Sequence, residues 1–599
     1  MRQASVMATS AAEWVEAVKE AERRGELLLA VDLGERGLAE CPEDGELAHR
    51  SVLALARSGS TEEAARRFTQ LRLDGREAED VGALAARIKK DAALAVRGDA
   101  RRRLAADAAA AYRRVYELTG GYYPAINAAT LELVAGKTGE AETTAREVLG
   151  LLEGETDDSY YAVATEAEAL LILGDVGGAT AALERAASSH GGDHAALATT
   201  RRQLGLVCEL RGIDPDVLAP LAGPPVFHYC GHRITAPGLG GRFPDEAEGE
   251  AAEKLRAEVA RHPPGYAYGS LAAGADILWA EGLLERGSEL NVVLPVERDE
   301  FVRRSVAPSG QGWIDRFDRC LDAARDVTCA TENALLEDDT LHRYGAELAM
   351  GLALLRSRFL GSEARQLALW DGGRAAGDAG TTIDVEVWRR AGQPVSVVRL
   401  DRAGASAAGQ TLDRERTRRV VRAMIFADVK GFTKLDDEQL PRFADHVLGA
   451  FASSLALYGD AVEHQNSWGD ALYVVLNDAA TAADCALDLQ RAMRSIDLAG
   501  AGLPAHLRLR LGAHVGPVFP VDDPVIGGQA FMGSHVSRTA RVEPVTPPGT
   551  VYVTEQFAAA LALSRRDDLR CDYVGHMPTA KGFGRLRMYR LRRSDGRDE

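Results

Sequence analysis

Two aspartates near the C-terminal end of the chain occupy positions where carboxylates could hold divalent cations. Asp428 follows the short apolar run 424–427, and Asp470 precedes the branched and aromatic run 472–476. Both runs are typical of β-strands, so each aspartate is expected at the edge of a strand. Two carboxylates on neighbouring strands are what a pair of Mg²⁺ or Mn²⁺ ions needs to hold a triphosphate, although acids at strand ends are often only solvated turn residues.

A glycine turn follows the first aspartate. Gly431 lets the backbone turn sharply before Phe432 and Thr433, so that amide N–H groups can point at phosphate oxygens. The pattern indicates phosphate binding beside the cation site.

Five short motifs in this part of the chain occur in a fixed order. They are Asp428-x-x-Gly431-Phe432-Thr433, Gly469-Asp470-Ala471, Gly512-x-His514-x-Gly516-Pro517-Val518, Gly533-x-x-Val536-Ser537-x-x-Ala540-Arg541-Val542-Glu543 and Lys581-Gly582-x-Gly584. With this order and spacing, residues 417–593 resemble the catalytic domain of class III nucleotidyl cyclases, the adenylyl and guanylyl cyclases. The resemblance implies an α+β, ferredoxin-like domain that converts a nucleoside triphosphate to a 3′,5′-cyclic nucleotide and pyrophosphate.

The resemblance also implies roles for individual residues. Asp428, Asp470 and the carbonyl of Val429 are expected to bind two Mg²⁺ or Mn²⁺ ions per site. Arg541 matches the family arginine that stabilises the transition-state phosphate, and Lys581 matches the lysine that binds the triphosphate. Family sites form at a head-to-tail interface, with the metals from one subunit and the arginine from the other, so a homodimer is implied.

Three positions depart from the family pattern where base and ribose are bound. Asn466 stands four residues before the second aspartate, where adenylyl cyclases carry Lys and guanylyl cyclases Glu; Ala530 replaces an aspartate that reads the base, and Ser537 replaces the asparagine that orients the ribose. An asparagine amide both donates and accepts hydrogen bonds, so the base stays open. A lost charged base contact costs about 1–3 kcal/mol of discrimination, and a lost positioning donor about 10²-fold in rate.

The first 215 residues are rich in Ala and Leu with helical periodicity. Gly59, Gly136 and Gly174 each stand five residues before an alanine, as in helix-turn-helix repeats close to the tetratricopeptide period. Residues 112–131 are similar to the TRAF-binding region of some MAP kinase kinase kinases. A helical solenoid that contacts a protein partner is implied; the alternative is a scaffold with no ligand of its own.

A different pattern begins after the prolines between 213 and 225, which break the helical periodicity. Strands alternating with helices predict a parallel, Rossmann-like α/β sheet. The predicted strands are 226–229, 291–296, 326–330, 366–370 and 395–400.

Small and polar residues recur at the ends of these strands, where such folds bind nucleotides. They are Gly231 and Arg233, Ser270 with Gly274 and Asp276, and Asp371 with Gly372. These motifs resemble the SLOG superfamily of Rossmann-like domains, which implies a second site for a nucleotide-derived ligand. The alternative is that the glycines only make tight βα turns.

Three domains are therefore expected: helical repeats over 1–215, a Rossmann-like domain over 224–402, and the cyclase-like domain over 417–596. A small, polar and charged segment, 401–417, has the composition of a linker between the last two.

Composition limits the partners. The chain has 599 residues and a formal net charge of −18, which disfavours non-specific binding to nucleic acids or anionic membranes. Charged residues interrupt every apolar run before the length of about 18 residues that a membrane helix needs, and no signal peptide is visible. Seven scattered cysteines predict reduced thiols, so a cytoplasmic protein is expected.

Two hypotheses of different classes follow. The first is a homodimeric, metal-dependent nucleotidyl cyclase, with ATP as the expected substrate, regulated by its N-terminal domains. The alternative, suggested by Asn466, Ala530 and Ser537, is a degenerate cyclase-like scaffold that binds nucleotides and protein partners without turnover.

Overall fold

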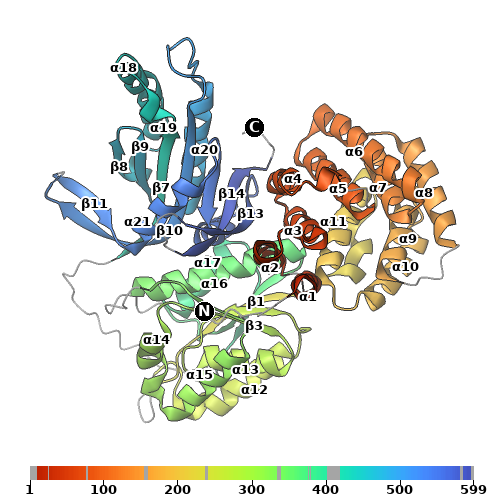
Figure 1. Cartoon of the computed structure of the whole chain (residues 1–599). Coiled ribbons are helices and arrows are strands. Elements are labelled where there is room, and N and C mark those ends of the chain that lie inside the picture. The colour runs from red at the N-terminus through yellow and green to blue at the C-terminus, as the bar shows by residue number, and fades with distance from the viewer. Residues whose placement is uncertain are drawn as a thin grey trace.

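The computed structural model describes residues 10–24, 26–75, 79–153, 159–235, 241–332, 339–374, 377, 379–400, 419–525, 527–579 and 584–594. An N-terminal helical part, a middle α/β domain and a C-terminal α+β domain follow one another along the chain (Figure 1). The predicted linker 401–417, with Lys581 and Gly582, lies outside the described residues.

The N-terminal part is a helical repeat region. Its helices are α1 (Ala11–Arg23), α2 (Leu27–Glu40), α3 (Gly45–Ser58), α4 (Thr61–Gln70), α5 (Glu79–Ala95), α6 (Gly98–Thr119), α7 (Tyr122–Val134), α8 (Thr138–Glu153), α9 (Tyr160–Leu173), α10 (Val176–Ser189) and α11 (His194–Arg211). Gly59, Gly136 and Gly174 end helices with φ of +92°, +84° and +83°. The alanines five residues later are fully buried, so the next helix packs closely against the previous one.

The middle domain is a six-stranded parallel sheet with helices on both faces. The strands are β1 (Val226–Gly231), β2 (Tyr266–Gly269), β3 (Glu289–Leu294), β4 (Asp326–Cys329), β5 (Ala364–Leu369) and β6 (Val395–Val398). The helices are α12 (Glu248–Val259), α13 (Ala275–Glu285), α14 (Arg298–Ser305), α15 (Gln311–Ala323), α16 (Asp339–Leu360) and α17 (Thr381–Arg390). The strand order β4-β3-β2-β1-β5-β6 reverses direction between β1 and β5. The five predicted strands are present, and β2 was not predicted.

The C-terminal domain is built on an eight-stranded mixed sheet. The strands are β7 (Val420–Lys430), β8 (Val462–Trp468), β9 (Ala471–Leu476), β10 (Arg508–Asp523), β11 (Gly528–Met532), β12 (Val551–Thr554), β13 (Leu569–Pro578) and β14 (Arg585–Arg593). Their order is β13-β14-β12-β10-β7-β9-β8, with β11 paired to β10. The helices are α18 (Gln439–Phe443), α19 (Gly449–Ala456), α20 (Ala479–Ser495), α21 (Ser534–Val542) and α22 (Glu555–Ala562).

The two faces of this sheet are covered differently. Alternate residues of β7, such as Ile425 and Ala427, enter the main core with α19, α20 and α22. Met424 and Phe426 point to the opposite face, where Val536 of α21 packs in a smaller apolar cluster. Strand alternation places Asp428 on the same face as Met424 and Phe426.

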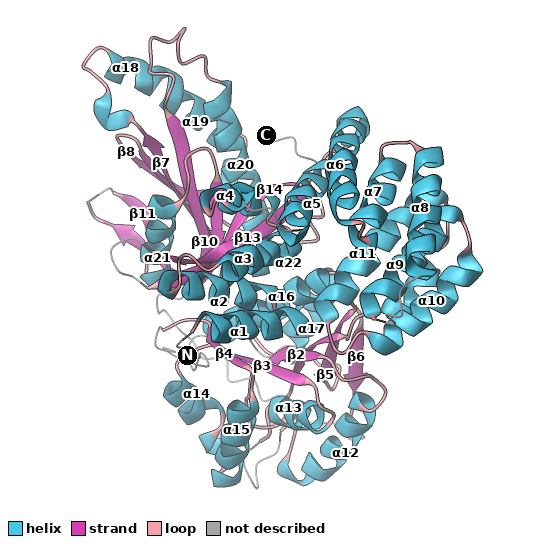
Figure 2. Cartoon of the chain, turned by 45° about the vertical axis from the view of Figure 1, so that its right-hand side comes forward, coloured by secondary structure: helices cyan, strands magenta, loops and turns pink. Residues whose placement is uncertain are grey.

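The helices α1 to α4 lie along the side of both other domains, next to the rest of the helical part (Figure 1). They share one continuous core with the C-terminal domain, and the Tyr573 hydroxyl of β13 donates a hydrogen bond to Asp32 of α2. On the other side, Arg325 donates two hydrogen bonds to Glu26, at 3.0 and 2.9 Å. The long helix α16 lies between the two sheets (Figure 2) and packs against α22.

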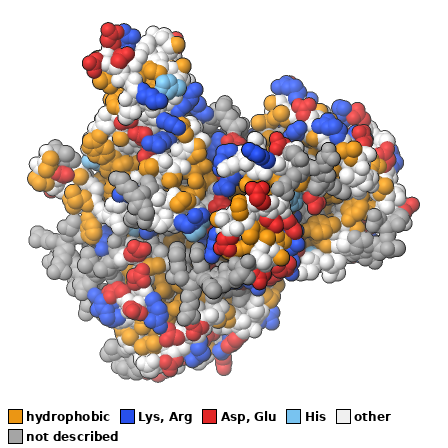
Figure 3. All heavy atoms as spheres, viewed as in Figure 1, with side chains coloured by type: hydrophobic (Ala, Val, Ile, Leu, Met, Phe, Trp, Pro, Cys, Tyr) orange, Lys and Arg blue, Asp and Glu red, His pale blue; other side chains and the backbone are white. Residues whose placement is uncertain are grey.

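None of the helices within the described ranges is long and apolar enough to cross a membrane. Acidic and basic side chains are interspersed over the visible face, and hydrophobic side chains gather at the left, over β8 and β11 (Figure 3).

Candidate active site

The register of the C-terminal sheet places four residues side by side across four strands. Trp468 pairs with Ala471, Ala471 with Asp428, and Asp428 with Arg510. Cross-strand partners point to the same face of a sheet, here the face that α21 covers. Asp470 lies in the turn between β8 and β9, next to this row. The structure thus brings the two predicted metal aspartates to one place.

The two carboxyl groups influence each other directly. The pKa of Asp470 is raised to about 6 by burial, by the negative charge of Asp428 and by a hydrogen bond between the two side chains. Like charges disfavour double ionisation, and a bound cation would remove that penalty. Paired acids that were only solvated turn residues would not repel each other in this way.

Two further charged residues complete the cluster. Arg510 donates from Nη2 and Nε to Oδ2 of Asp428, at 2.7 and 3.1 Å, and its Nε lies 2.5 Å from Oε1 of Glu543. The pKa of Glu543 is raised to about 7. Burial is the main cause, Asp428 and Asp470 raise the pKa as well, and Arg510 partly offsets the rise. Neither residue has a role predicted from the sequence. Glu543 ends the motif that begins at Gly533, and Arg510 stands two residues before Gly512, so nearness to a motif is the one signal that could have found them.

The donor set fits a divalent cation. Two carboxylates, with the carbonyl of Val429 as the expected third ligand, offer the hard oxygen donors that Mg²⁺ and Mn²⁺ prefer. Among the described residues no group of three His, Cys, Asp or Glu side chains could hold a metal ion. Substrate phosphates and water would therefore complete the coordination, as is usual for Mg²⁺.

The turn that is expected to bind phosphate, Gly431 to Thr433, lies next to the two aspartates. Gly431 has φ of +102°, a left-handed conformation that glycine adopts without strain. Phe432 packs against Phe443, with ring centres 4.8 Å apart, and a Cβ on Gly469 would lie 3.5 Å from the Phe432 ring. Thr433 is exposed. The glycine turns of the first two motifs are therefore in contact.

The positions expected to read the base lie beside the aspartates. Asn466 pairs with Tyr473, which pairs with Phe426, so this row is adjacent to that of Asp428 and on the same face. Ala530 lies buried on β11, which approaches β8 where Nδ1 of His464 is 2.9 Å from the carbonyl of Gln529. A nucleotide with its phosphates at Asp428 would extend its base toward these strands.

The side chain of Trp468 lies open at the rim of this site. It is 54% exposed, at the end of β8 and at the edge of the sheet, and none of the described residues covers it. A base or a second subunit could use this ring.

Of the remaining predicted residues, the structure describes Ser537 and Arg541 but not Lys581. Ser537 is exposed and Arg541 half-buried on α21, and Arg541 makes no ion pair with any residue in the described part of the chain. Lys581 lies outside the described residues, between β13 and β14, which approach each other where the Thr579 N–H donates to the Gly584 carbonyl at 2.8 Å.

The second predicted site falls at the point where the middle sheet reverses its strand order. Open α/β sheets bind ligands at this point, beyond the carboxyl ends of the strands. Here Nε2 of His232, after β1, lies 3.1 Å from Oδ1 of Asp371, after β5. Gly372 has φ of +81°, Arg233 donates to the carbonyl of Arg304 at 3.2 Å, and the buried Oγ of Ser270 has no hydrogen-bond partner among the described residues.

Three members of that set have packing roles. A Cβ on Gly231 would lie 2.3 Å from the Cβ of Ala275, and one on Gly274 would lie 2.4 Å from the backbone nitrogen of Ile234. Asp276 accepts a hydrogen bond from the Ala272 N–H at 3.3 Å, and burial raises its pKa to about 7. These three residues favour the tight-turn alternative, whereas Arg233, Ser270, Asp371 and Gly372 stay as predicted ligand contacts.

Comparisons with known proteins assign the two ends of the chain. Residues 414–593 match the family described as adenylate and guanylate cyclase catalytic domain, and residues 26–132 match the family described as tetratricopeptide repeats-sensor. The C-terminal domain is a class III cyclase domain. No curated protein matches the chain, and the SLOG resemblance of the middle domain stays a prediction.

Solved structures similar to the cyclase domain include three cyclases. The guanylate cyclase domain of RhGC from Catenaria anguillulae, in complex with GTP, has 17% identity, a TM-score of 0.26, and coverage of 29% of this chain and 96% of its own. The adenylyl cyclase CyaB from P. aeruginosa has 16% identity, a TM-score of 0.27, and coverage of 30% and 96%. An adenylate cyclase from Trypanosoma brucei has 21% identity, a TM-score of 0.26, and coverage of 30% and 90%.

Proposed function

We propose that this protein is a metal-dependent nucleotidyl cyclase that converts a nucleoside triphosphate, with ATP as the expected substrate, to a 3′,5′-cyclic nucleotide and pyrophosphate. The observation that carries the proposal is the pair of Asp428 and Asp470, set side by side in a cyclase domain, where burial and the neighbouring carboxylate raise the pKa of Asp470. Two bound Mg²⁺ or Mn²⁺ ions would lower the pKa of the attacking hydroxyl and neutralise the triphosphate.

The chain's own residues would position the substrate. The Gly431 turn, with Phe432 and Thr433, offers backbone N–H groups to the phosphates beside the aspartates. Asn466 and Ala530 would line the base, and Ser537 the ribose. Catalysis of phosphoryl transfer depends mainly on such positioning and on charge neutralisation.

The active unit would be a homodimer. Arg541 on α21 would reach the site of the partner subunit, and its lack of an ion pair within the described residues leaves its guanidinium available for a phosphate. The helical repeats and the middle domain would regulate the dimer, through a protein partner and a nucleotide-derived ligand respectively.

The test is direct. Purified protein with Mn²⁺ and each of the four nucleoside triphosphates in turn should yield a cyclic nucleotide and pyrophosphate, measured by mass spectrometry. Asp428→Asn and Asp470→Asn should each lower the rate by about 10²–10³-fold or more, because each removes a carboxylate that would bind the metal ions. Asp437→Asn, an exposed aspartate in the loop after Lys434, is the matched control and should keep full activity. No product with any triphosphate would contradict the proposal.

The scaffold alternative has its own support. Ala530 and Ser537 lack the side chains that the family uses to hold base and ribose, so binding could persist without turnover. Triphosphate binding in calorimetry, combined with no cyclic product in the four assays, would favour this second function.

A further inference from the structure

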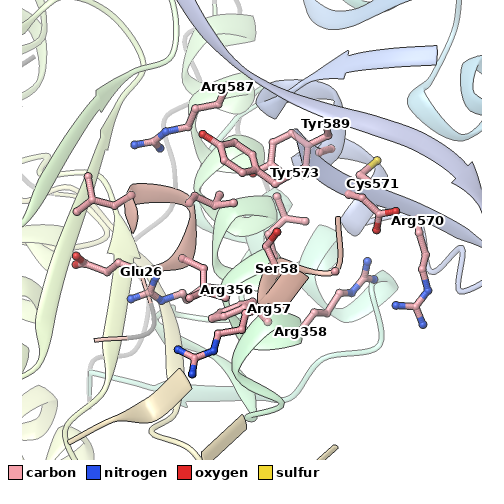
Figure 4. Close-up of a pocket in the computed structure, with 18 of the residues that line it drawn as sticks. Glu26, Arg57, Ser58, Arg356, Arg358, Arg570, Cys571, Tyr573, Arg587 and Tyr589 are labelled. Carbon is pink, nitrogen blue, oxygen red and sulfur yellow. The ribbon is translucent and has the colours of Figure 1, made fainter. Parts of the chain in front are cut away.

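A deep cavity lies where the three parts of the chain meet. Its volume is about 1630 Å³, and its walls come from the helical part, from β2, β3, β4 and α16 of the middle domain, and from α22, β13 and β14 of the cyclase domain (Figure 4). Pockets for drug-sized ligands usually occupy about 300–1,000 Å³, so the cavity has room for a larger molecule. Asp428 and Asp470 are not among its lining residues, so the proposed reaction does not use it.

The lining is basic although the protein is acidic. Fifteen Lys and Arg side chains face nine Asp and Glu side chains among the described lining residues, whereas the whole chain has a net charge of −18. A concentration of positive charge inside a low-dielectric cavity focuses the field on anions.

Several of these cations form ion pairs that join the domains to each other or brace a strand. Arg325 is paired with Glu26, at 2.9 Å, Arg587 with Glu555, at 3.2 Å, and Arg592 with Asp572, at 2.5 Å. Their charges are already balanced, so they are structural.

Four of the others, which we call the cavity cations, have no direct ion pair, although Asp91 acts on Lys90 and Arg202, and Asp567 on Arg358, from a greater distance. They are Lys90 of α5, Arg202 of α11, Arg358 of α16 and Arg570 of β13, and none of them forms an ion pair with a described residue. Lys90 donates to the amide oxygens of Asn127 and Gln203, both at 2.8 Å, and Arg358 to the Ala562 carbonyl at 2.9 Å. These neutral acceptors do not neutralise a positive charge.

The cavity cations are close enough to repel one another. Burial and the nearby charge of Arg87 together lower the pKa of Lys90 to about 8 and that of Arg202 to about 10. Arg570 lowers the pKa of Arg202 and of Arg358. Figure 4 shows Arg358 and Arg570 as neighbours on one wall.

A buried donor in the same cavity also lacks a partner. Arg87 is only 9% exposed, and its Nε has no hydrogen-bond partner among the described residues, although Asp91 lies 3.5 Å away. A buried donor without an acceptor is costly, and a bound anion would satisfy it.

We propose that this cavity binds a small molecule that carries several phosphate groups, held by Lys90, Arg202, Arg358 and Arg570. Arginine forks bind phosphate through paired N–H donors, and four cations without an ion pair to a described residue match an anion of several charges. The rings of Phe359 and Tyr268 also line the cavity, and a nucleotide base could lie on them. Because the cavity cations come from all three parts of the chain, the ligand would join them.

Two probes distinguish a nucleotide ligand from a ligand that is recognised by its polyphosphate group alone. Full-length protein in EDTA, carrying Asp470→Asn so that the candidate active site is disabled, is titrated with inorganic tripolyphosphate and with ATP in a calorimeter. Both probes should bind, and added salt should weaken them, since the attraction is electrostatic. Tighter binding of ATP identifies a nucleotide as the ligand class, and equal affinities identify the polyphosphate group alone.

Variants locate the binding. Arg202→Ala and Arg358→Ala should each weaken both probes at least tenfold, whereas Arg103→Ala, an exposed arginine of α6 outside the cavity, should leave the affinities unchanged. Unchanged affinities in the cavity variants, or no binding of either probe at millimolar concentration, would overturn the proposal.

A second measurement excludes a merely structural role. Removing one of several repelling cations should leave the thermal midpoint of the ligand-free protein unchanged or raised in Arg202→Ala. A midpoint lowered by several degrees would show that Arg202 supports the fold instead, and would count against the site.

Discussion

At the scale of single residues, Arg510 is the counter-charge of the two aspartates that are proposed to bind metal. It reaches Asp428 and Glu543 at once, while Asp470 and Glu543 both have raised pKa values, of about 6 and 7. An acid whose folded pKa is raised binds protons more tightly in the folded state. Its stabilising contribution is therefore present below about pH 4 and is lost as pH rises through about 6 to 7.

This balance predicts a pH-dependent effect of Arg510→Met. Without the guanidinium, ionised Asp428, Asp470 and Glu543 would repel one another unopposed, so the variant should lose more stability at pH 7.5 than at pH 5.5. Thermal unfolding of both proteins in EDTA at the two pH values measures the difference. Arg508→Met is the control and should show no such pH dependence. Arg508 lies two residues away on the same strand, and its only hydrogen bonds within the described part of the chain go to the Ala505 and Leu507 carbonyls. An equal loss at both pH values would contradict the argument.

The sequence predicted the aspartates but not this counter-charge, for a physical reason. Asp428 and Asp470 are recognisable because each stands beside a glycine turn at a strand edge. Arg510 meets Asp428 only through the antiparallel register of β7 and β10, which no local pattern determines. Glu543 reaches the pair from the end of α21, more than 70 residues after Asp470 in the chain, and only the packing of that helix places it there.

At the scale of elements, α16 connects the middle domain to the cyclase domain. The Tyr344 hydroxyl donates to the Val515 carbonyl of β10 at 3.0 Å, and further along α16 packs against α22. Gly351 is the point of closest approach, because a Cβ there would lie 2.3 Å from the carbonyl oxygen and 2.7 Å from the Cβ of Ala559.

A single methyl group at this contact should therefore separate the two helices. Gly351→Ala is expected to cost about 1–3 kcal/mol through overpacking, although alanine is the better helix former. Gly150→Ala is the matched control in α8: nothing described lies within 4 Å of its added Cβ, so it should stabilise by about 0.5–1 kcal/mol. The free energy of the first unfolding transition in urea, compared with that of the wild-type protein, measures the effect of each variant. A neutral or stabilising Gly351→Ala would show that α16 and α22 can separate without loss.

In the middle domain, the local sequence predicts most of the strands but not all of them. The strands β1 and β3 to β6 were predicted because branched apolar runs mark strands that are buried on both faces. The strand β2, with the sequence Tyr-Ala-Tyr-Gly, has no branched residue and is four residues long, so its place in the sheet comes from pairing with β1 and β3. The reversal of strand order between β1 and β5 likewise required the tertiary structure.

At the scale of the whole molecule, the cyclase domain retains an uncovered apolar flank. Trp468, Met532 and Val525, on or beside β8 and β11, are 54%, 51% and 91% exposed, and Figure 3 shows hydrophobic side chains gathered over these strands. This flank adjoins the candidate base-reading row, so a second subunit seated there would lie next to the substrate. Large exposed apolar side chains gathered on one flank are typical of protein interfaces.

A shared site makes the homodimer testable by mixing two inactive variants. Asp428→Ala removes metal ligands and Arg541→Ala removes the arginine, so each homodimer has two defective sites. If each site takes its aspartates from one subunit and its arginine from the other, a mixed dimer has one site with both defects and one site with neither. With equal amounts and random pairing, half of the dimers are mixed, so co-expression should restore about a quarter of the wild-type rate. Mixing Asp428→Ala with Asp470→Ala is the control and should restore nothing, because both changes affect the same half of the site. Failure of the first mixture, while both variants still dimerise in sedimentation, would place Arg541 and the aspartates in one subunit.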